Sequence, residues 1–230
     1  MVGGGFSIQG SYHEKNQDAY WVGEVSDGYV VALSDGLGSC KYSEVGSKTL
    51  CEVVSELANR KKCLIEDADV FARQVEENWR LSIRHKLYKI EDCHATALFA
   101  VVGNVNTWVF RLGDGVIGIK SVGGTNVLCD SKEDGYVNVT DCLGISSHLW
   151  ERFCVATTDL LGIFMCSDGV TDDNDKENLI DLTEGIYAEY SNRMKGEIEE
   201  DLSQWVPTMK SRDDKTVVFL FKSALKEVLA

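Results

Sequence analysis

Short apolar runs come before longer helical patterns in the first third of this chain of 230 residues. The runs have the length of strands and predict three of them, at Phe6–Gln9, Ala19–Val22 and Tyr29–Leu33. From Ser43, and again from Asp67, apolar residues recur every three or four positions, which is the spacing of an amphipathic helix. The first third therefore predicts three strands followed by two helices.

Strand-length runs dominate the middle of the chain, and glycine, asparagine and aspartate separate them at the spacing of hairpins. The predicted strands are Thr96–Val102, Thr107–Leu112, Val116–Ser121, Thr125–Cys129, Tyr136–Val139, Phe153–Thr157 and Gly162–Cys166. Two helical patterns follow, from Leu179 to Tyr190 and from Ile198 to Trp205, and Thr216–Phe221 is the last strand.

Strands in hairpins with helices in pairs predict an α+β domain built in layers, whereas a regular alternation of strand and helix would predict a parallel sheet. The single proline and the evenly spread glycines mark no linker, and no segment is of low complexity. We therefore expect residues 1–230 to form a single domain.

The composition is that of a globular protein with a substantial core, since 44% of the residues are hydrophobic and 26% are charged. No apolar run approaches the ~18 residues that span a bilayer, and the N-terminus lacks the features of a signal peptide. The eight cysteines show neither a CxxC pair nor zinc-ligand spacing, so we expect mostly buried, reduced thiols. These features together predict a cytoplasmic protein.

The net charge of −14 excludes nucleic acid and anionic membranes as partners, because both are bound through basic surfaces. The acidic excess is compatible with a metal site in which a cation neutralises several carboxylates.

One tripeptide, Ser-Asp-Gly, ends two of the apolar runs. It occurs at Ser34-Asp35-Gly36 and again at Ser167-Asp168-Gly169. Each copy by itself is most simply a turn, because Asp-Gly is a strong turn signal. Two buried strands that end in the same way can, however, deliver two carboxylates to one place.

Further aspartates lie at the edges of predicted strands, and each alone is an ordinary loop aspartate. Asp18 precedes the second strand, Asp114 lies between two strands, and Asp213 and Asp214 precede the last one. Carboxylates that converge at the rim of a sandwich need raised pKa values or a bound cation. Oxygen ligands without cysteine or histidine favour Mg²⁺, Mn²⁺ or Ca²⁺, and two such ions about 4 Å apart can activate water and bind a phosphoryl group.

The order and context of these segments resemble the bacterial form of the metal-dependent Ser/Thr protein phosphatases of type 2C, the PPM family. The matching segments run through nearly the whole chain. They are Asn16-Gln17-Asp18-Ala19, Ser34-Asp35-Gly36-Leu37-Gly38, Ala95-Thr96-Ala97-Leu98, Leu112-Gly113-Asp114-Gly115, Cys166-Ser167-Asp168-Gly169-Val170-Thr171-Asp172 and Arg212-Asp213-Asp214-Lys215-Thr216-Val217-Val218. Each motif alone is weak, and the order of all six makes the resemblance specific.

The resemblance implies a four-layer α-β-β-α sandwich, in which paired helices flank two antiparallel sheets and the metal site lies at one end. It implies two Mn²⁺ or Mg²⁺ ions, a water or hydroxide that bridges them and attacks phosphorus, and a phosphorylated protein substrate that a Ser/Thr kinase supplies. We also expect a monomer. The metal residues that the resemblance implies are Asp18, Asp35, the carbonyl of Gly36, Asp168 and Asp213, with Asp114 and Asp168 at a third, weaker metal.

Two residues and one segment stand out among the departures from the family pattern. His13 stands where the family has an arginine that holds the substrate phosphate, five residues before Asp18. A histidine can donate a hydrogen bond to phosphate or act as an acid, but it cannot form a bidentate fork, and a plain surface histidine is the alternative. Asp214 replaces an asparagine and is expected beside the ligands rather than among them. The segment from Cys129 to Cys142 is shorter than the family's flap, which predicts an open site.

Two other functions fit the same sequence. One is a non-catalytic relative that keeps the fold as an interaction module, which the exchange at His13 would favour and the retained aspartates oppose. The other is a phosphatase of a small phosphorylated metabolite, which an open site would admit.

Overall fold

Two five-stranded antiparallel sheets face each other in the computed structural model, which describes residues 1–129, 140–146, 149–171 and 176–222. The strand order of the first sheet is β1 (Val2–Ile8), β10 (Lys215–Phe221), β9 (Leu160–Cys166), β6 (Val116–Ser121) and β7 (Gly124–Leu128). The order of the second is β2 (Ala19–Val25), β3 (Gly28–Ser34), β4 (Ala97–Val102), β5 (Asn106–Leu112) and β8 (Glu151–Ala156).

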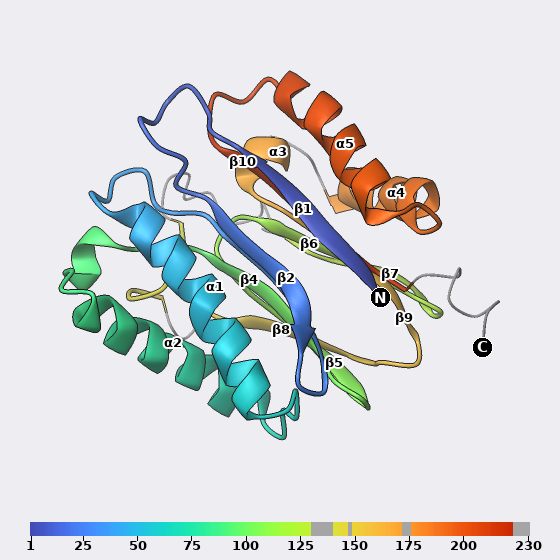
Figure 1. Ribbon diagram of the computed structural model, residues 1–230, viewed down its shortest axis with the longest axis horizontal. Coiled ribbons are helices and arrows are strands. Elements are labelled where there is room, and N and C mark those ends of the chain that lie inside the picture. The colour runs from blue at the N-terminus through green and yellow to red at the C-terminus, as the bar shows by residue number, and fades with distance from the viewer. Residues whose placement is uncertain (130–139, 147–148, 172–175, 223–230) are drawn as a thin grey trace.

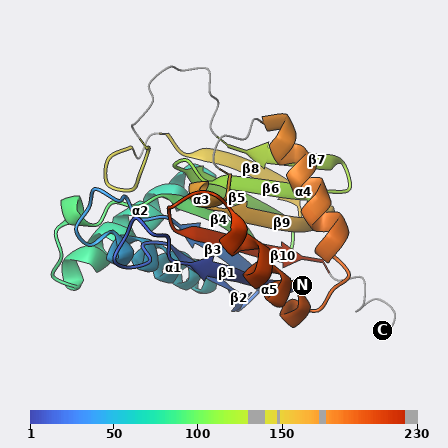
Figure 2. The same cartoon turned by 90° about the horizontal axis from the view of Figure 1, so that it is seen from above.

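Helices cover the outer faces of both sheets (Figure 1). On the second sheet lie α1 (Ser43–Arg60) and α2 (Ala68–His85), and on the first lie α4 (Lys176–Tyr190) and α5 (Lys195–Trp205). Figure 2 shows the same order of layers from a second direction. The described residues also form three short helical segments, which are η1 (Ile90–Asp92), α3 (Asp168–Thr171) and η2 (Val206–Thr208). The predicted α+β sandwich of four layers is therefore confirmed.

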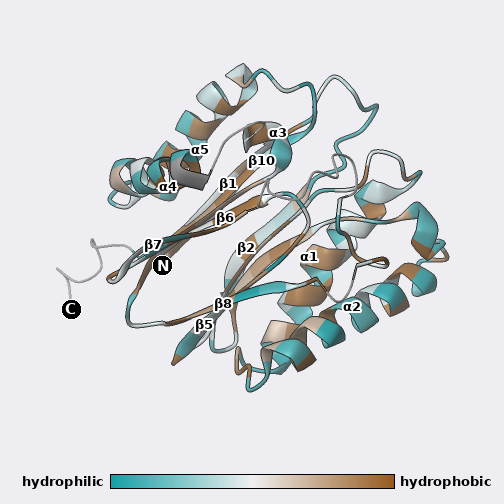
Figure 3. Ribbon diagram, turned by 180° about the vertical axis from the view of Figure 1, so that it is seen from behind, coloured by the Kyte–Doolittle hydropathy of each residue, from teal (hydrophilic) through white to brown (hydrophobic). Residues whose placement is uncertain are grey.

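The central strands are apolar throughout because both of their faces are buried. Along β3, Val30 and Ala32 pack under α1 and α2, while Val31 and Leu33 pack between the sheets. The strands β4, β9 and β10 alternate in the same way, so three apolar layers separate the four layers of secondary structure. In Figure 3, brown prevails along the strands between the two pairs of helices, as at β10. A side-chain period of two with both faces buried gives the continuous apolar runs seen in the sequence.

Two side-chain contacts anchor the helices on the second sheet. Asp67 caps α2, and its side chain accepts the backbone N–H of Val70 at 3.0 Å. Trp79 is fully buried in the core under the second sheet, and its indole N–H donates to the carbonyl of Gly46 at 2.9 Å. None of the helices in the described residues combines the length and the apolar character needed to cross a bilayer.

The first strand begins earlier than predicted, at Val2 rather than Phe6. Its glycines allow close packing, because a side chain on Gly3 would lie 2.6 Å from Val22 and one on Gly4 would lie 2.4 Å from Glu199 of α5. A run of glycines carries no strand signal in the sequence, whereas here pairing with β10 fixes it. The predicted strand Tyr136–Val139 lies outside the described residues.

All eight cysteines are free thiols, as expected. Five of them are buried, but Cys154 is exposed on the edge strand β8, and Cys40 and Cys129 are half-buried. The expectation that most of the thiols are buried is therefore confirmed, and these three positions are the exceptions.

Candidate active site

The end of β3 is tied to the start of β4 at three points around Thr96. The hydroxyl of Ser34 donates to the carbonyl of Thr96 at 2.6 Å, and the N–H of Asp35 donates to the Thr96 hydroxyl at 2.9 Å. The N–H of Thr96 in turn donates to the carbonyl of Asp35 at 2.8 Å. These bonds fix the backbone from which the Asp35 carboxylate projects.

Gly36 lies where no side chain fits. It forms an isolated antiparallel bridge with Ala95, and a side chain on it would lie 2.7 Å from Cβ of Ser43, at the start of α1. The glycine therefore lets α1 begin directly against the strand end that carries Asp35.

Asp18 is held by two hydroxyl groups from the other sheet. Its side chain is 5% exposed, and its Oδ2 accepts hydrogen bonds from Ser167 at 2.9 Å and Thr216 at 2.6 Å. Among the described residues, its buried Oδ1 has no hydrogen-bond partner. An unpartnered buried carboxylate oxygen is costly for an apo protein and is suited to binding a cation.

Asp168 begins the short helix α3 rather than ending β9, because the chain turns directly after Ser167. Its Oδ1 is also buried and has no hydrogen-bond partner among the described residues. A side chain on the next residue, Gly169, would lie 2.1 Å from the carbonyl oxygen of Asp214, so the helix packs tightly on the start of β10.

A cavity of about 200 Å³ collects most of the predicted site residues. Its walls are formed by His13, Asp35, Gly36, Leu37, Gly38, Thr96, Asp114, Thr140, Asp168 and Asp213. Asp18 is absent from these walls and lies buried beside Asp35, whose pKa it affects. Residues from both sheets and from both ends of the chain therefore meet at one cavity.

Burial and mutual repulsion raise the pKa values of three of these carboxylates. Burial is the main cause for each, and it raises the pKa of Asp18 to about 7 and that of Asp168 to about 6. The pKa of Asp35 is raised well above its usual range, by burial first and then by the carboxylates of Asp18, Asp168 and Asp114. A bound cation would remove this repulsion.

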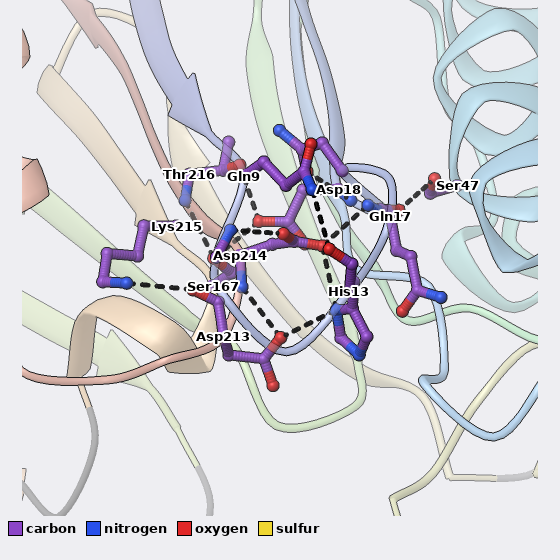
Figure 4. A network of polar contacts seen from close by, with 12 residues as sticks. Gln9, His13, Gln17, Asp18, Ser47, Ser167, Asp213, Asp214, Lys215 and Thr216 are labelled. Atoms are coloured by element: carbon purple, nitrogen blue, oxygen red, sulfur yellow. Dashed lines mark hydrogen bonds and ion pairs between the residues drawn. The ribbon is translucent and has the colours of Figure 1, made fainter.

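His13 contacts two carboxylates at the edge of the cavity (Figure 4). Its Nδ1 lies 3.3 Å from Oδ1 of Asp213 and 3.3 Å from Oδ2 of Asp214. The opposite ring nitrogen, Nε2, lies 3.0 Å from where a side chain on Gly38 would begin. With 20% of its side chain exposed and two acidic partners, His13 is not an isolated surface histidine.

A protein-family model described as protein phosphatase 2C matches residues 10–207. The chain belongs to the protein phosphatase 2C family. This family consists of serine/threonine protein phosphatases that depend on metal ions, so the predicted membership is confirmed. The matched range contains Asp18, Asp35, Asp114 and Asp168.

Solved structures of bacterial phosphatases share the protein phosphatase 2C fold with this chain. One is a bacterial serine phosphatase, at 17% identity, with 97% of this chain and 98% of the other covered and a TM-score of 0.73. Another is the serine/threonine phosphatase Stp1 from Staphylococcus aureus, at 16% identity, with 97% and 96% covered and a TM-score of 0.73. A third is the catalytic domain of the phosphatase PstP in complex with two manganese ions, at 16% identity, with 94% and 96% covered and a TM-score of 0.68. Among curated proteins, none matches the sequence.

The last predicted site residue, Asp213, lies beyond the range that the phosphatase 2C model matches, and the structure is what places it. It lies on the wall of the same cavity and faces His13. Asp114 lies on the wall as well, and one of its oxygens accepts the hydroxyl of Thr140 at 2.7 Å. All seven predicted residues of this phosphatase are therefore within or directly behind the cavity.

Neutral hydroxyl groups are the part of the site that the sequence did not reveal. Ser167 and Thr216 hold Asp18, and Thr96 holds the backbone of Asp35. The bonds to Asp18 join positions 149 and 198 residues apart in the chain. The only sequence signal is that each hydroxyl residue stands next to, or within three residues of, a site aspartate or inside a family motif.

Proposed function

We propose that this chain hydrolyses phosphoserine and phosphothreonine in proteins with two Mn²⁺ or Mg²⁺ ions bound at the cavity. One observation carries the proposal. Three buried carboxylates converge there with raised pKa values, and two of them, Asp18 and Asp168, have an oxygen without a partner among the described residues.

The donor set fits these ions. Among the described residues, the cavity walls offer the carboxylates of Asp35, Asp114, Asp168 and Asp213 and no cysteine, and such oxygen donors suit Mg²⁺ and Mn²⁺. In our proposal the two ions are held by Asp18, Asp35, the carbonyl of Gly36, Asp168 and Asp213. Asp114, with Asp168, would hold a third ion more weakly. The PstP structure with two manganese ions, which has the same fold, supports the number.

When bound, two such ions would supply a water-derived nucleophile and would neutralise charge on the transferring phosphoryl group. The chain's own residues orient this chemistry. Ser167 and Thr216 hold one oxygen of Asp18 and leave the other free, and Thr96 fixes the backbone of Asp35. These contacts present the carboxylates in place before substrate arrives, which is the preorganisation that catalysis requires.

His13 is the residue that we assign to the substrate phosphate. It lines the cavity beside Asp213, and its Nε2 faces the Gly38 loop across from the carboxylates that engage Nδ1. When both ring nitrogens carry a hydrogen, Nδ1 can donate to the carboxylates while Nε2 donates a hydrogen bond to a phosphate oxygen or a proton to the leaving group.

The substrate that we propose is a phosphorylated protein, the product of a Ser/Thr kinase, in keeping with the family. We also propose that residues 1–230 act as a single domain, because the cavity combines residues from position 13 to position 213.

Turnover of an aryl phosphate tests the catalytic proposal. The purified protein should hydrolyse it with Mn²⁺ and stop when EDTA is added. Asp35→Asn should lower kcat/KM by about a thousandfold, since a metal site supplies several kcal/mol of transition-state stabilisation. The matched control is Asp159→Asn, an exposed aspartate between β8 and β9, which should keep full activity. Absence of Mn²⁺-dependent turnover in the wild type would refute an enzymatic function.

The substrate class is decided by a second assay on the active protein. Phosphopeptides should be cleaved with a higher kcat/KM than small phosphorylated metabolites of similar charge. A clear preference for the metabolites would overturn the protein substrate and keep the metal chemistry.

A further inference from the structure

A buried carboxylate outside the proposed metal ligands joins the N-terminal loop to the start of β10. Asp214 is only 1% exposed, and three nitrogen atoms of the loop surround it, of which Figure 4 labels the residues His13 and Gln17. The backbone N–H of Gly10 donates to its Oδ1 at 2.7 Å, and that of Gln17 donates to its Oδ2 at 2.7 Å. The same Oδ2 lies 3.3 Å from Nδ1 of His13.

These contacts need both oxygens of a carboxylate. In an asparagine, one of the two positions carries an N–H₂ group, which cannot accept a hydrogen bond. An asparagine turned one way would lose the bond from Gly10, and turned the other way it would lose the bond from Gln17. The aspartate at position 214 is therefore matched to the loop that it holds.

The loop lies directly on the segment that contains Asp214. A side chain on Gly10 would lie 2.2 Å from the carbonyl group of Asp213, so the two backbones are in close contact. The N–H of Tyr12 donates to the carbonyl of Arg212 at 3.1 Å. The side chain of Asp214 contacts this loop at Gly10, His13 and Gln17. The position of the loop is thereby fixed at three points.

We propose that Asp214 is a positioning residue that holds His13 and Asp18 in place for the phosphate and the metal ions. The inference rests on the function proposed above. In it, the carboxylate accepts the hydrogen of His13 Nδ1 and so leaves Nε2 directed at the Gly38 side of the cavity. The bond from Gln17 places the next residue, Asp18, between the hydroxyl groups of Ser167 and Thr216.

Asp214→Asn tests the role through two readouts. Loss of a residue that orients ligands lowers metal affinity or activity by about 10- to 100-fold. We expect a drop of this size in Mn²⁺ affinity by calorimetry and in kcat/KM, with a raised KM because His13 is displaced. The matched control is Asp67→Asn, which also replaces a carboxylate that accepts a backbone N–H, at the start of α2. It should stay within about twofold, since asparagine caps helices as well as aspartate does.

Two outcomes would overturn the proposal. One is an Asp214→Asn protein that matches the Asp67→Asn protein in Mn²⁺ affinity and KM. The other is a lower kcat with unchanged KM and unchanged Mn²⁺ affinity, because that pattern reports a smaller fraction of folded enzyme.

The ring of His13 gives a readout on the unmodified protein, which decides the question if Asp214→Asn does not fold. In metal-free protein with ¹⁵N-labelled histidine, we expect a hydrogen on Nδ1 of His13, with the signal assigned by its loss in His13→Gln. A neutral ring with its hydrogen on Nε2 and a bare Nδ1 would contradict the proposal. This measurement needs neither metal nor substrate. Absence of turnover in the wild type would therefore refute the proposed function, whereas the ¹⁵N measurement alone decides the placement of His13.

Discussion

The tripeptide Ser-Asp-Gly occurs twice, and its two copies reach the same cavity from different sheets. The first, at positions 34–36, follows β3, and the second, at positions 167–169, follows β9. After Asp35 the chain stays extended and Gly36 bridges to Ala95, whereas Asp168 begins the helix α3. An identical local sequence therefore delivers a carboxylate to one place through two different backbone conformations.

The two serines show what distinguishes the copies. Ser34 bonds a backbone carbonyl, that of Thr96, and so anchors a strand end. Ser167 bonds a side-chain carboxylate, that of Asp18, and accepts the N–H of Thr216. The strand pattern sets where each serine lies, and residues distant in the sequence set what each serine does.

Replacing Gly36 or Gly169, the glycines of the two tripeptides, by alanine should give the largest loss of stability. A side chain at position 169 would lie 2.1 Å from a backbone oxygen, and one at position 36 would lie 2.7 Å from Cβ of Ser43. Overpacking typically costs about 1–3 kcal/mol and more where backbone atoms clash. We expect Gly169→Ala to lose at least about 3 kcal/mol of unfolding free energy and Gly36→Ala somewhat less, measured by urea denaturation.

The control for both glycines is Gly185→Ala, in α4, where nothing lies within 4 Å of an added side chain. It should gain about 0.5–1 kcal/mol because alanine is the better helix former. Equal stability of Gly169→Ala and Gly185→Ala would show that the close approach at α3 does not exist in solution.

Asp35 and Asp168, the aspartates of the two tripeptides, should make the metal-free protein less stable as the pH rises. Burial raises the pKa of Asp168 from 3.8 to about 6, so the folded state binds the proton more tightly than the unfolded state does. Its contribution to stability is complete below pH 3.8 and is lost as the pH rises through about 6. At pH 8, Asp168→Asn should be more stable than wild type by on the order of 3 kcal/mol.

The same comparison at Asp35 should give a larger gain, because three other carboxylates raise the pKa of this residue. Thermal unfolding in EDTA between pH 4 and pH 8 measures both variants. Saturating Mn²⁺ should remove the advantage of each variant, since the cation then neutralises the wild-type cluster. A wild-type stability that rises across this pH range in EDTA would contradict the proposed cluster of repelling carboxylates.

Replacing Ser34 or Ser167 by alanine should give the smallest effects, one on stability and the other on Mn²⁺ affinity. Ser167→Ala removes a donor from Asp18 and should weaken Mn²⁺ binding about tenfold. Ser34→Ala removes one buried bond to a backbone carbonyl and should cost about 1 kcal/mol of stability. It should leave Mn²⁺ affinity within about twofold. Calorimetry and urea denaturation of both variants test this, and the reverse pattern would mean that the two roles are wrongly assigned.

Most of the fold could be predicted because the inner strands are buried on both faces. The apolar runs of β3, β9 and β10 predict strands from the local sequence alone, without reference to the neighbouring strands. The glycine-rich start of β1 could not be recognised, because only its partner β10 and the helix α5 make it a strand. The four residues of α3 are too few to show a helical period.

The acidic half of the site could be predicted, and the groups that hold it could not. Asp18, Asp35 and Asp168 stand at strand ends, which the apolar runs mark in the sequence. The three bonds to Asp214 join positions 197 to 204 residues apart, and no local pattern encodes such contacts. Hydroxyl residues such as Thr96 are common in strands, so their place beside a site aspartate or in a family motif does not by itself reveal what they bond.

Calorimetric titration of the metal-free protein with Mn²⁺ tests the central claim most directly. We predict that the wild type binds two ions tightly, and that Asp35→Asn, which removes the buried carboxylate that interacts with Asp18, Asp168 and Asp114, loses tight binding of both. A single tight ion in the wild type, or two ions that persist unchanged in Asp35→Asn, would contradict a two-metal site built on the first Ser-Asp-Gly.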